Sequence, residues 1–328
     1  MTLINHINKI FKHQDDKYAM NKRVIITAYE CPDLDGTACA IAYKEFLEKK
    51  RNNVIVAFFK EPSLEAKFVL EKIGIPKVLD IDKIINLNDS IILVDASEIS
   101  VMSKKILPEK VIEVIDHRKI NESEKFPKAR IQIEFVGSAA TLIAEKYYKK
   151  KVAISKASAT LLYSAIVSNT INFKAKVTTD RDKKMAKWLL PQAKISKNFV
   201  HEMFVFKSKF HKPLKSVLDD DLATFNLYSH KIGISQLEII NSKKFINNNI
   251  LKIKKILKEL QSKDSLDMIF LTCIDTKKGF NTFVIIDDNV KSLVENCLNV
   301  KFSKGVARRE GIIMRKEIVP IIKEKLTN

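Results

Sequence analysis

Between residues 24 and 190, short β-branched runs alternate with longer segments of helical periodicity. The predicted strands cover residues 24–28, 54–58, 91–94 and 111–115. The predicted helices cover residues 37–50, 64–73, 138–149, 156–168 and 180–190. Strands and helices that alternate in this way form a mostly parallel sheet covered by helices on both faces. We therefore predict an α/β fold of the doubly wound type for this part of the chain.

Acidic residues stand where three of these predicted strands end. Asp33 and Asp35 follow the first strand, Asp95 follows the third, and Asp116 and His117 follow the fourth. Open α/β sheets bind ligands beyond the carboxyl ends of their strands, so acids placed there can hold a cation. The alternative is that Asp33 and Asp35 merely cap the next helix. Because three strand ends share the pattern, we favour a metal site.

The residue types in this cluster suit a divalent metal. Carboxylates are oxygen ligands for Mg²⁺ or Mn²⁺, and a histidine nitrogen favours Mn²⁺ and other transition metals. Such ions can activate a water molecule and hold the oxygens of a phosphoryl group. Carboxylates gathered at one point repel one another unless cations neutralise them, which also favours a metal.

The chain is strongly basic, with a formal net charge of +19 over 328 residues. This charge favours polyanionic partners such as polyphosphate, nucleotides or nucleic acid, although a general compositional bias towards lysine also explains it. The four cysteines show no CxxC spacing, which favours reduced thiols in the cytoplasm. No apolar run approaches the roughly 20 residues that a membrane span requires.

The pattern changes in the last third of the chain. A polar stretch over residues 207–213 ends at Pro213 and is predicted to be a linker. Beyond it, two predicted hairpins, 222–240 and 268–286, are each followed by a helix, at 245–260 and 290–298. We therefore predict an N-terminal extension over residues 1–21, a first domain over 22–206, and a smaller α+β domain with a mixed sheet over 214–328.

Seven short segments along the chain resemble, in order, the motifs of one known superfamily. In order, the segments are Tyr29-Glu-Cys-Pro-Asp33-Leu-Asp35, Leu93-Val-Asp95, Ile115-Asp-His-Arg118, Val136-Gly-Ser138, Leu161 to Asn169, Ile232 to Gln236 and Met314-Arg315-Lys316. The series resembles the DHH phosphoesterase superfamily. It is most similar to the branch with a C-terminal DHHA2 domain, which contains manganese-dependent inorganic pyrophosphatases, exopolyphosphatases and the prune proteins.

The resemblance implies an active site in the cleft between the two domains. It implies metal ligation by Asp33, Asp35, Asp95, His117 and Asn169. It implies substrate binding by Arg118, Arg315, Lys316, Lys207 and Lys209. Asp116 and His117 are the expected catalytic pair, in which Asp116 orients His117 or assists proton transfer.

This chain departs from the superfamily's pattern at three positions. Tyr29 stands where the pyrophosphatases have a histidine ligand of one metal, and Asn169 stands where they have an aspartate ligand of the other. Arg118 replaces the second histidine of the name-giving motif, as in prune. A phenol is a poor ligand at neutral pH and an amide oxygen carries no charge. We therefore expect weaker metal binding and a shift from Mn²⁺ towards Mg²⁺.

These observations predict a hydrolase of phosphoanhydride bonds that uses one or two Mg²⁺ or Mn²⁺ ions and a metal-activated water. Short-chain polyphosphate is placed slightly ahead of pyrophosphate because Glu30 and Arg118 resemble the exopolyphosphatase and prune branch. The alternative is a catalytically impaired relative that binds a phosphate compound or a nucleotide as a regulatory protein. No membrane partner is expected, nucleic acid binding rests on the net charge alone, and a homodimer stays open.

Overall fold

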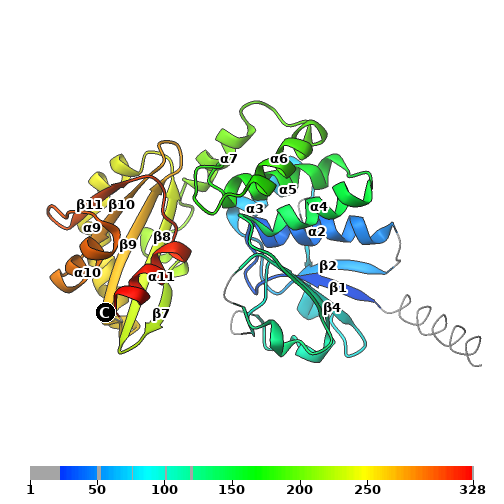
Figure 1. The fold of residues 1–328 in the computed structure, drawn as a ribbon, viewed down its shortest axis with the longest axis horizontal. Helices are drawn as coiled ribbons and strands as arrows, with labels where there is room; N and C mark the ends of the chain where they lie inside the picture. Colours follow the sequence, from blue (N-terminus) through cyan, green and yellow to red (C-terminus); the bar gives the residue numbers. More distant parts are fainter. Residues whose placement is uncertain (1–22, 50–52, 76, 100–101, 119–120, 327–328) are drawn as a thin grey trace, which may run out of the picture. The chain divides into compact units, whose positions relative to one another are not determined.

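A computed structural model describes residues 23–49, 53–75, 77–99, 102–118 and 121–326 (Figure 1). They form two compact units. The first comprises the described residues up to Thr170 together with Val177–Lys197, and the second comprises Ile171–Lys176 together with the described residues from Asn198 on. The predicted extension over residues 1–21 lies outside the described residues. Within the described ranges, no helix is long and apolar enough to cross a membrane.

The first unit is built on a six-stranded parallel sheet in the order β3-β2-β1-β4-β5-β6. Its strands are β1 Val24–Thr27, β2 Val54–Phe58, β3 Leu79–Asp80, β4 Ser90–Val94, β5 Val111–Asp116 and β6 Arg130–Ile133. The predicted parallel α/β fold is therefore confirmed. The strand order reverses between β1 and β4, and such a reversal is where open α/β sheets bind ligands.

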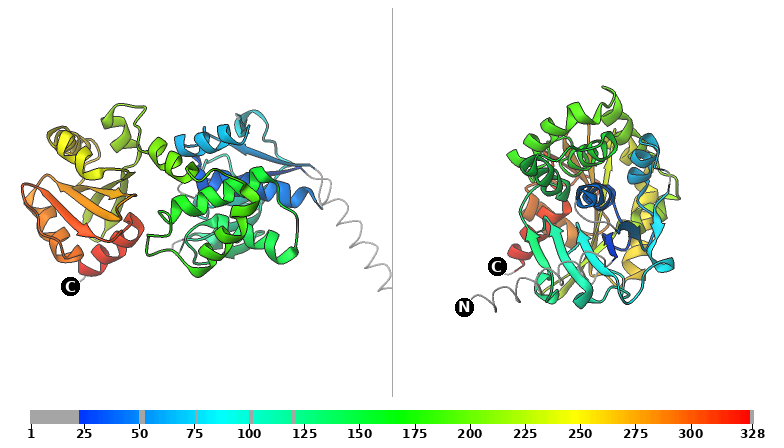
Figure 2. Two further views of the ribbon diagram at one scale, coloured as in Figure 1. Left: turned by 90° about the horizontal axis from the view of Figure 1, so that it is seen from above. Right: turned by 90° about the vertical axis from the view of Figure 1, so that its right-hand side faces the viewer.

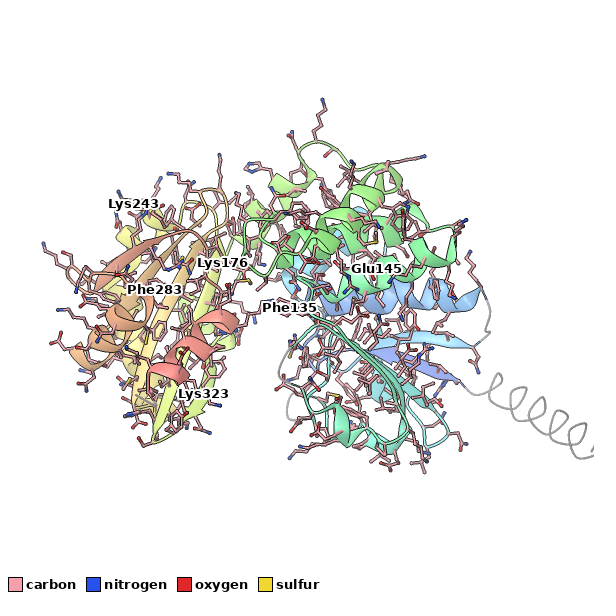
Figure 3. The ribbon with its side chains drawn as sticks, viewed as in Figure 1. Phe135, Glu145, Lys176, Lys243, Phe283 and Lys323 are labelled. Atoms are coloured by element: carbon pink, nitrogen blue, oxygen red, sulfur yellow. The ribbon has the colours of Figure 1, made fainter. Side chains whose placement is uncertain are left out.

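Helices cover one face of this sheet. They are α2 Leu34–Glu48, α3 Leu64–Lys72, α4 Ala139–Lys150, α5 Lys156–Asn169 and α6 Asp180–Ala193. The right-hand view of Figure 2 shows α2 end-on, with strands on one side and α5 and α6 on the other. Glu145 of α4 accepts hydrogen bonds of 2.7 and 2.8 Å from Arg181 of α6, which ties these two helices together (Figure 3).

The opposite face of the sheet is covered by connections rather than by α-helices, so the helices that were predicted on both faces lie on one face. Met102 and Ile106 follow β4, Phe126 follows β5, and all three are buried in one cluster with Ile25 and Leu93 of the sheet. The connections on either side of β4 and β5 contain short 3₁₀ turns, among them η1 Ile81–Lys83, η3 Pro108–Lys110 and η4 Ser123–Lys125. Among the described residues, short segments without long helices therefore follow the carboxyl ends of β4 and β5, and a short junction joins β1 to α2.

The second unit is a five-stranded mixed sheet in the order β11-β10-β9-β8-β7. Its strands are β7 Ala223–Leu227, β8 His230–Ile239, β9 Met268–Asp275, β10 Phe280–Ile285 and β11 Val306–Glu310. Only the pairing of β8 with β9 is parallel among these strands. Both predicted hairpins are confirmed as β7–β8 and β9–β10, so the α+β character of this part is as expected.

Helices pack on both faces of the second sheet. They are α7 Phe199–Lys207, α8 Leu214–Asp220, α9 Ser242–Lys263, α10 Asp288–Leu298 and α11 Arg315–Lys325. Residues of α8 and α9 share one buried cluster with the sheet, and residues of α10 and α11 share another that includes Phe283 of β10 (Figure 3). Helix α7 also belongs to this unit, because the compact units part at residues 197–198, before the predicted linker.

One short segment from the middle of the chain, Ile171–Lys176, is built into the second unit. Lys174 donates from Nζ to the carbonyl oxygens of Thr276 and Lys277, at 2.9 and 2.8 Å, in the turn between β9 and β10. The first three residues of the segment all have positive φ, between 50° and 63°. The ammonium group of Lys174 therefore ties this segment to the β9–β10 turn.

Candidate metal centre

The junction between β1 and α2 places its two acids in different surroundings. Asp33 is the N-cap of α2, and its Oδ1 accepts a hydrogen bond of 3.0 Å from the Gly36 N–H. Its side chain is exposed, whereas Asp35, in the first turn of the helix, is fully buried. The capping alternative thus describes Asp33, and Asp35 needs another explanation, because burying a carboxylate is costly unless it is paired.

Asp35 is held by the start of helix α4. Its Oδ1 accepts from Ser138 Oγ at 2.8 Å and from the Ala140 N–H at 2.9 Å, and its Oδ2 accepts from the Ala139 N–H at 2.8 Å. The first N–H groups of a helix lack partners within the helix and carry the positive end of its dipole. The start of α4 therefore binds an anion, the carboxylate of Asp35.

Asn169, the last residue of α5, also contacts Asp35. Its Nδ2 donates to Asp35 Oδ2 at 2.6 Å. A carboxylate only accepts hydrogen bonds, so the nitrogen end of the amide faces it. Ligation of a metal by Asn169 Oδ1 at this point requires the amide to turn over, so its role as a ligand stays a prediction.

Two further acids lie at the ends of the neighbouring strands β4 and β5. The side chain of Asp95 is buried, and its backbone has the left-handed conformation, with φ 52°. Its N–H donates to the Ile115 carbonyl at 2.8 Å. Asp116 is buried at the end of β5, where it accepts hydrogen bonds from Ser97 Oγ and, at 2.7 Å, from the His117 N–H. Burial raises the pKa of Asp116, and these hydrogen bonds oppose that rise.

The ring of His117 is oriented by a backbone carbonyl. Its Nδ1 lies 2.8 Å from the Val136 oxygen, which can only accept, so Nδ1 carries the hydrogen. The lone pair of the neutral imidazole is then on Nε2. We expected Asp116 to orient the ring, but Asp116 accepts a hydrogen bond from the backbone N–H of His117. The Val136 carbonyl contacts the ring instead.

Asp35, Asp95 and His117 together form the group that best fits a metal. One ligand atom of each lies within 4.8 Å of the other two, and all three residues are buried. His117 Nε2 lies 3.4 Å from Asp95 Oδ1 and 3.9 Å from Asp35 Oδ2. Two carboxylates and one imidazole nitrogen are donors that suit a divalent cation such as Mn²⁺. The exposed Asp33 is not part of this group.

Arg118 adds a positive charge beside the group. Its Nη1 donates to the Asp95 carbonyl at 3.0 Å, and its Nη2 lies 3.6 Å from Asp95 Oδ1. Burial lowers the pKa of Arg118 to about 10, so it stays protonated at neutral pH. Its guanidinium lies over the ring of Tyr29, with 4.2 Å between Cζ and the ring centroid.

The other predicted substrate-binding residues belong to the second unit. Arg315, the first residue of α11, donates from Nη1 to Asp221 Oδ2 at 3.0 Å and to the Ile234 carbonyl at 2.9 Å. Lys207 is paired with Glu238 at 2.7 Å. The side chains of Lys209 and Lys316 are exposed. Their binding of substrate stays a prediction.

Two residues of the centre were not predicted from the sequence. Ser97, two residues after Asp95, is buried and donates to Asp116. Cys39, one helical turn after Asp35, lies with its Sγ 3.5 Å from Asp35 Oδ1. Burial and the neighbouring acids raise the pKa of the Cys39 thiol well above its ordinary value, so it is a neutral donor. The spacing of four residues on a helix is the signal that could have identified Cys39.

Comparisons with known proteins match both units. The model of the DHH family, N-terminal domain, matches residues 23–166, and that of the DHHA2 domain matches residues 201–325. A manganese-dependent inorganic pyrophosphatase of Methanocaldococcus jannaschii is 32% identical over 90% of this chain and 96% of its own. The crystal structure of a candidate family II inorganic pyrophosphatase from Methanococcus jannaschii has a TM-score of 0.76 at 30% identity, covering 93% of this chain and 100% of its own. An exopolyphosphatase-related protein from Bacteroides fragilis shares the fold, with a TM-score of 0.52 at 15% identity, over 96% of this chain and 95% of its own.

Proposed function

Because this chain belongs to the DHH family and carries the DHHA2 domain, we propose that it is a divalent-metal-dependent hydrolase of phosphoanhydride bonds. The observation that carries the proposal is the buried group of Asp35, Asp95 and His117, in which His117 Nε2 lies 3.4 Å from Asp95 Oδ1 and 3.9 Å from Asp35 Oδ2. The relatives are named inorganic pyrophosphatases, so pyrophosphate is the first substrate to test. Short-chain polyphosphate remains the second.

Asp35, Asp95 and His117 would hold the metal, and Asp33 and Asn169 are further candidate ligands. Mn²⁺ is the first candidate, because the relatives are named manganese-dependent, and Mg²⁺ is the alternative. A bound cation of this kind lowers the pKa of water and polarises phosphoryl oxygens.

The remaining groups of the centre have roles that follow from their contacts. The α4 N–H groups and Ser138 fix both oxygens of Asp35, so this carboxylate is positioned before any ligand arrives. Val136 fixes the tautomer of His117. Arg118 exposes 31% of its side chain, which allows it to bind a phosphate oxygen while it contacts Asp95. Asp116 is proposed to accept a proton, as its raised pKa favours.

The test is the release of phosphate from pyrophosphate, tripolyphosphate and longer polyphosphate, each with Mn²⁺, Mg²⁺ or Co²⁺. We expect turnover of pyrophosphate, and we expect Asp95→Ala to lower kcat/KM at least about 100-fold by removing a ligand. Asp288→Ala, which changes an exposed aspartate of α10, is the matched control and should retain activity.

A regulatory binding protein is the second candidate, favoured by one observation. The Asn169 amide already satisfies Asp35 Oδ2, so part of the centre is held without a metal. If no substrate turns over above the Asp95→Ala background with any of the three metals, the hydrolase proposal fails. Binding of pyrophosphate without turnover, measured by calorimetry, would then support the regulatory function.

A further inference from the structure

The guanidinium of Arg118 is a fixed cation inside the candidate metal centre. It lies between two buried carboxylates, with Nη2 at 3.6 Å from Asp95 Oδ1 and Nη1 at 3.8 Å from Asp116 Oδ2. Its hydrogen bond to the Asp95 carbonyl fixes the same end of the side chain. Asp95 therefore has His117 Nε2 near its Oδ1 and the guanidinium beside it, so one carboxylate faces both the metal group and a permanent charge.

Tyr29 provides the surface on which this guanidinium rests. The ring centroid lies 4.2 Å from Arg118 Cζ, within the range of a cation–π contact. Tyr29 is itself partly buried, because its ring packs against the cluster that contains Ile25 and Leu93. The arginine is thus held from one side by an anchored aromatic face and from the other by Asp95 and Asp116. Planar stacking of this kind is available to arginine and not to lysine.

The charges of the centre indicate how many metal ions it needs. Asp35, Asp95 and Asp116 are fully buried. Arg118 forms ion pairs with Asp95 and Asp116 and so brings one positive charge to this group. The three buried carboxylates and one guanidinium leave two negative charges, which a single divalent cation neutralises. Asp33 is left out of this count because it is exposed and solvent screens its charge. The start of helix α4 further offsets the charge of Asp35. A second divalent cation would leave a buried excess of positive charge beside Arg118, which is costly.

We propose that this chain binds one divalent cation, on Asp35, Asp95 and His117, and that Arg118, positioned by Tyr29, supplies the charge of a second. The inference rests on the proposed function only in that both require a metal at this centre. It assigns Tyr29 a positioning role through its ring face, so its phenol oxygen is not a ligand. It also gives Arg118 a role in the protein before substrate arrives.

The experiment measures the number of bound metal ions in the absence of substrate. The full-length chain is stripped with chelator, dialysed against saturating Mn²⁺, and analysed for metal content and by electron paramagnetic resonance, which separates a lone Mn²⁺ from a spin-coupled pair. The variants are Arg118→Met, which removes the charge, Arg118→Lys, which keeps the charge without the stack, and Tyr29→Phe, which keeps the ring without the hydroxyl. Arg130→Met is the matched control, because it breaks a different arginine pair, with Glu113, in the same unit.

We expect one uncoupled Mn²⁺ per chain in the wild type, in Tyr29→Phe and in Arg130→Met. Arg118→Met should take up a second ion or bind the first about tenfold more tightly, because a repelling charge is lost. Arg118→Lys should retain one ion. If Arg118→Met does not fold, the wild type and Tyr29→Phe still decide the number of ions, and Arg118→Gln, which also removes the charge, takes its place as the test of Arg118.

A coupled pair in the wild type would overturn the proposal. So would weaker Mn²⁺ binding in Tyr29→Phe, which would make the phenol oxygen a ligand, or an Arg118→Met variant that binds Mn²⁺ as the wild type does. These outcomes do not depend on turnover. A chain that binds one Mn²⁺ but hydrolyses nothing would defeat the proposed function alone, and an active chain with two ions would defeat this inference alone.

Discussion

Asn169 and Asp35 attract each other in the absence of any cation, because an amide N–H meets a carboxylate oxygen at 2.6 Å. Two carboxylates at the same distance would repel each other unless a cation lay between them. The identity of the side chain at position 169 therefore sets how strongly the folding of the first unit depends on metal.

Asn169→Asp should separate these two situations. In chelator we expect a loss of about 1–3 kcal/mol of stability, because a charge-assisted hydrogen bond is replaced by repulsion. In Mn²⁺ we expect a larger metal-induced rise in unfolding temperature than in the wild type. Thermal unfolding with and without Mn²⁺ measures both effects. Asn169→Ala, which removes the bond without adding charge, is the control, and equal metal-induced shifts in Asn169→Asp and the wild type would contradict the expectation.

A second residue-level prediction concerns Asp89, at the amino end of β4. Burial by itself raises the pKa of Asp89, but two hydrogen bonds of 2.7 Å from Arg23 and one of 2.8 Å from the Asn86 N–H bring it below the ordinary value of 3.8. A carboxyl with a lowered pKa stabilises the fold above the pKa of the unfolded chain. That contribution is lost as the pH falls through the folded pKa.

The stability difference between the wild type and Asp89→Asn should therefore be about 1–2 kcal/mol at pH 7 and should shrink as the pH falls below about 4. Urea unfolding at a series of pH values measures it. Arg130→Met, which removes the exposed partner of a different carboxylate, Glu113, controls for general charge effects. A difference that stays constant from pH 7 to pH 3 would show that the ionised form of Asp89 contributes nothing.

At the residue scale, the sequence predicted the members of the centre better than their roles. Asp35, Asp95 and His117 come together because the carboxyl ends of parallel strands meet, which the alternation of elements already implies. The tautomer of His117 depends on a carbonyl, and every residue has one, so no side-chain pattern could reveal Val136. The stacking of Arg118 on Tyr29 joins residues far apart in the chain, for which no spacing rule exists.

At the scale of elements, helix α2 packs closely against the end of β1 at Gly36. A Cβ atom at this position would lie 2.7 Å from the Ala28 Cβ, so the helix approaches the strand end as closely as it does because Gly36 has no side chain. This approach brings Asp35 to the start of α4. A side chain at Gly36 would push α2 away from the sheet.

Gly36→Ala should destabilise the protein by about 1–3 kcal/mol through overpacking, even though alanine favours helix. It should also weaken Mn²⁺ binding by displacing Asp35. Denaturant unfolding and Mn²⁺ titration measure the two effects. The double change Ala28→Gly with Gly36→Ala removes the opposing methyl group and should recover part of both losses. Failure of the double variant to recover would place the cause elsewhere.

The strands that the sequence missed are those with little buried apolar surface. β3 has two residues, and β6, at the opposite edge of the sheet, is half exposed, so neither carries a continuous apolar run. Both are stabilised by pairing with a neighbour, which is a tertiary effect. β11 was missed for the same reason, because its sequence Val-Ala-Arg-Arg-Glu has only two apolar residues. The long buried runs of β1, β4 and β5 were predicted within about two residues.

For the molecule as a whole, the candidate metal centre lies entirely within the first unit. A ligand that binds one unit stabilises that unit, and it stabilises the other only as far as the two unfold together. Metal binding therefore reports on the cooperativity between the units without any cut in the chain.

Hydrogen exchange of the full-length chain, with and without Mn²⁺, should show greater protection of β1, β4, β5 and the start of α4. Strands β8 to β10 of the second unit should change little. Asp95→Ala, which removes a ligand, should abolish the difference. Equal gains in protection across both sheets would show that the two units open as one.

The short segment Ile171–Lys176 has a consequence for any attempt to divide this protein. The chain leaves the first unit at Thr170, returns at Val177 and leaves again after Lys197, and the family models leave residues 167–200 between them. A gene fragment that begins at Asn198 would encode the second sheet without Lys174, whose ammonium group binds the two carbonyls of the β9–β10 turn. No single cut yields two whole units. Recombinant halves, or chimaeras that exchange one half with a relative, need a junction that carries this segment with the second unit.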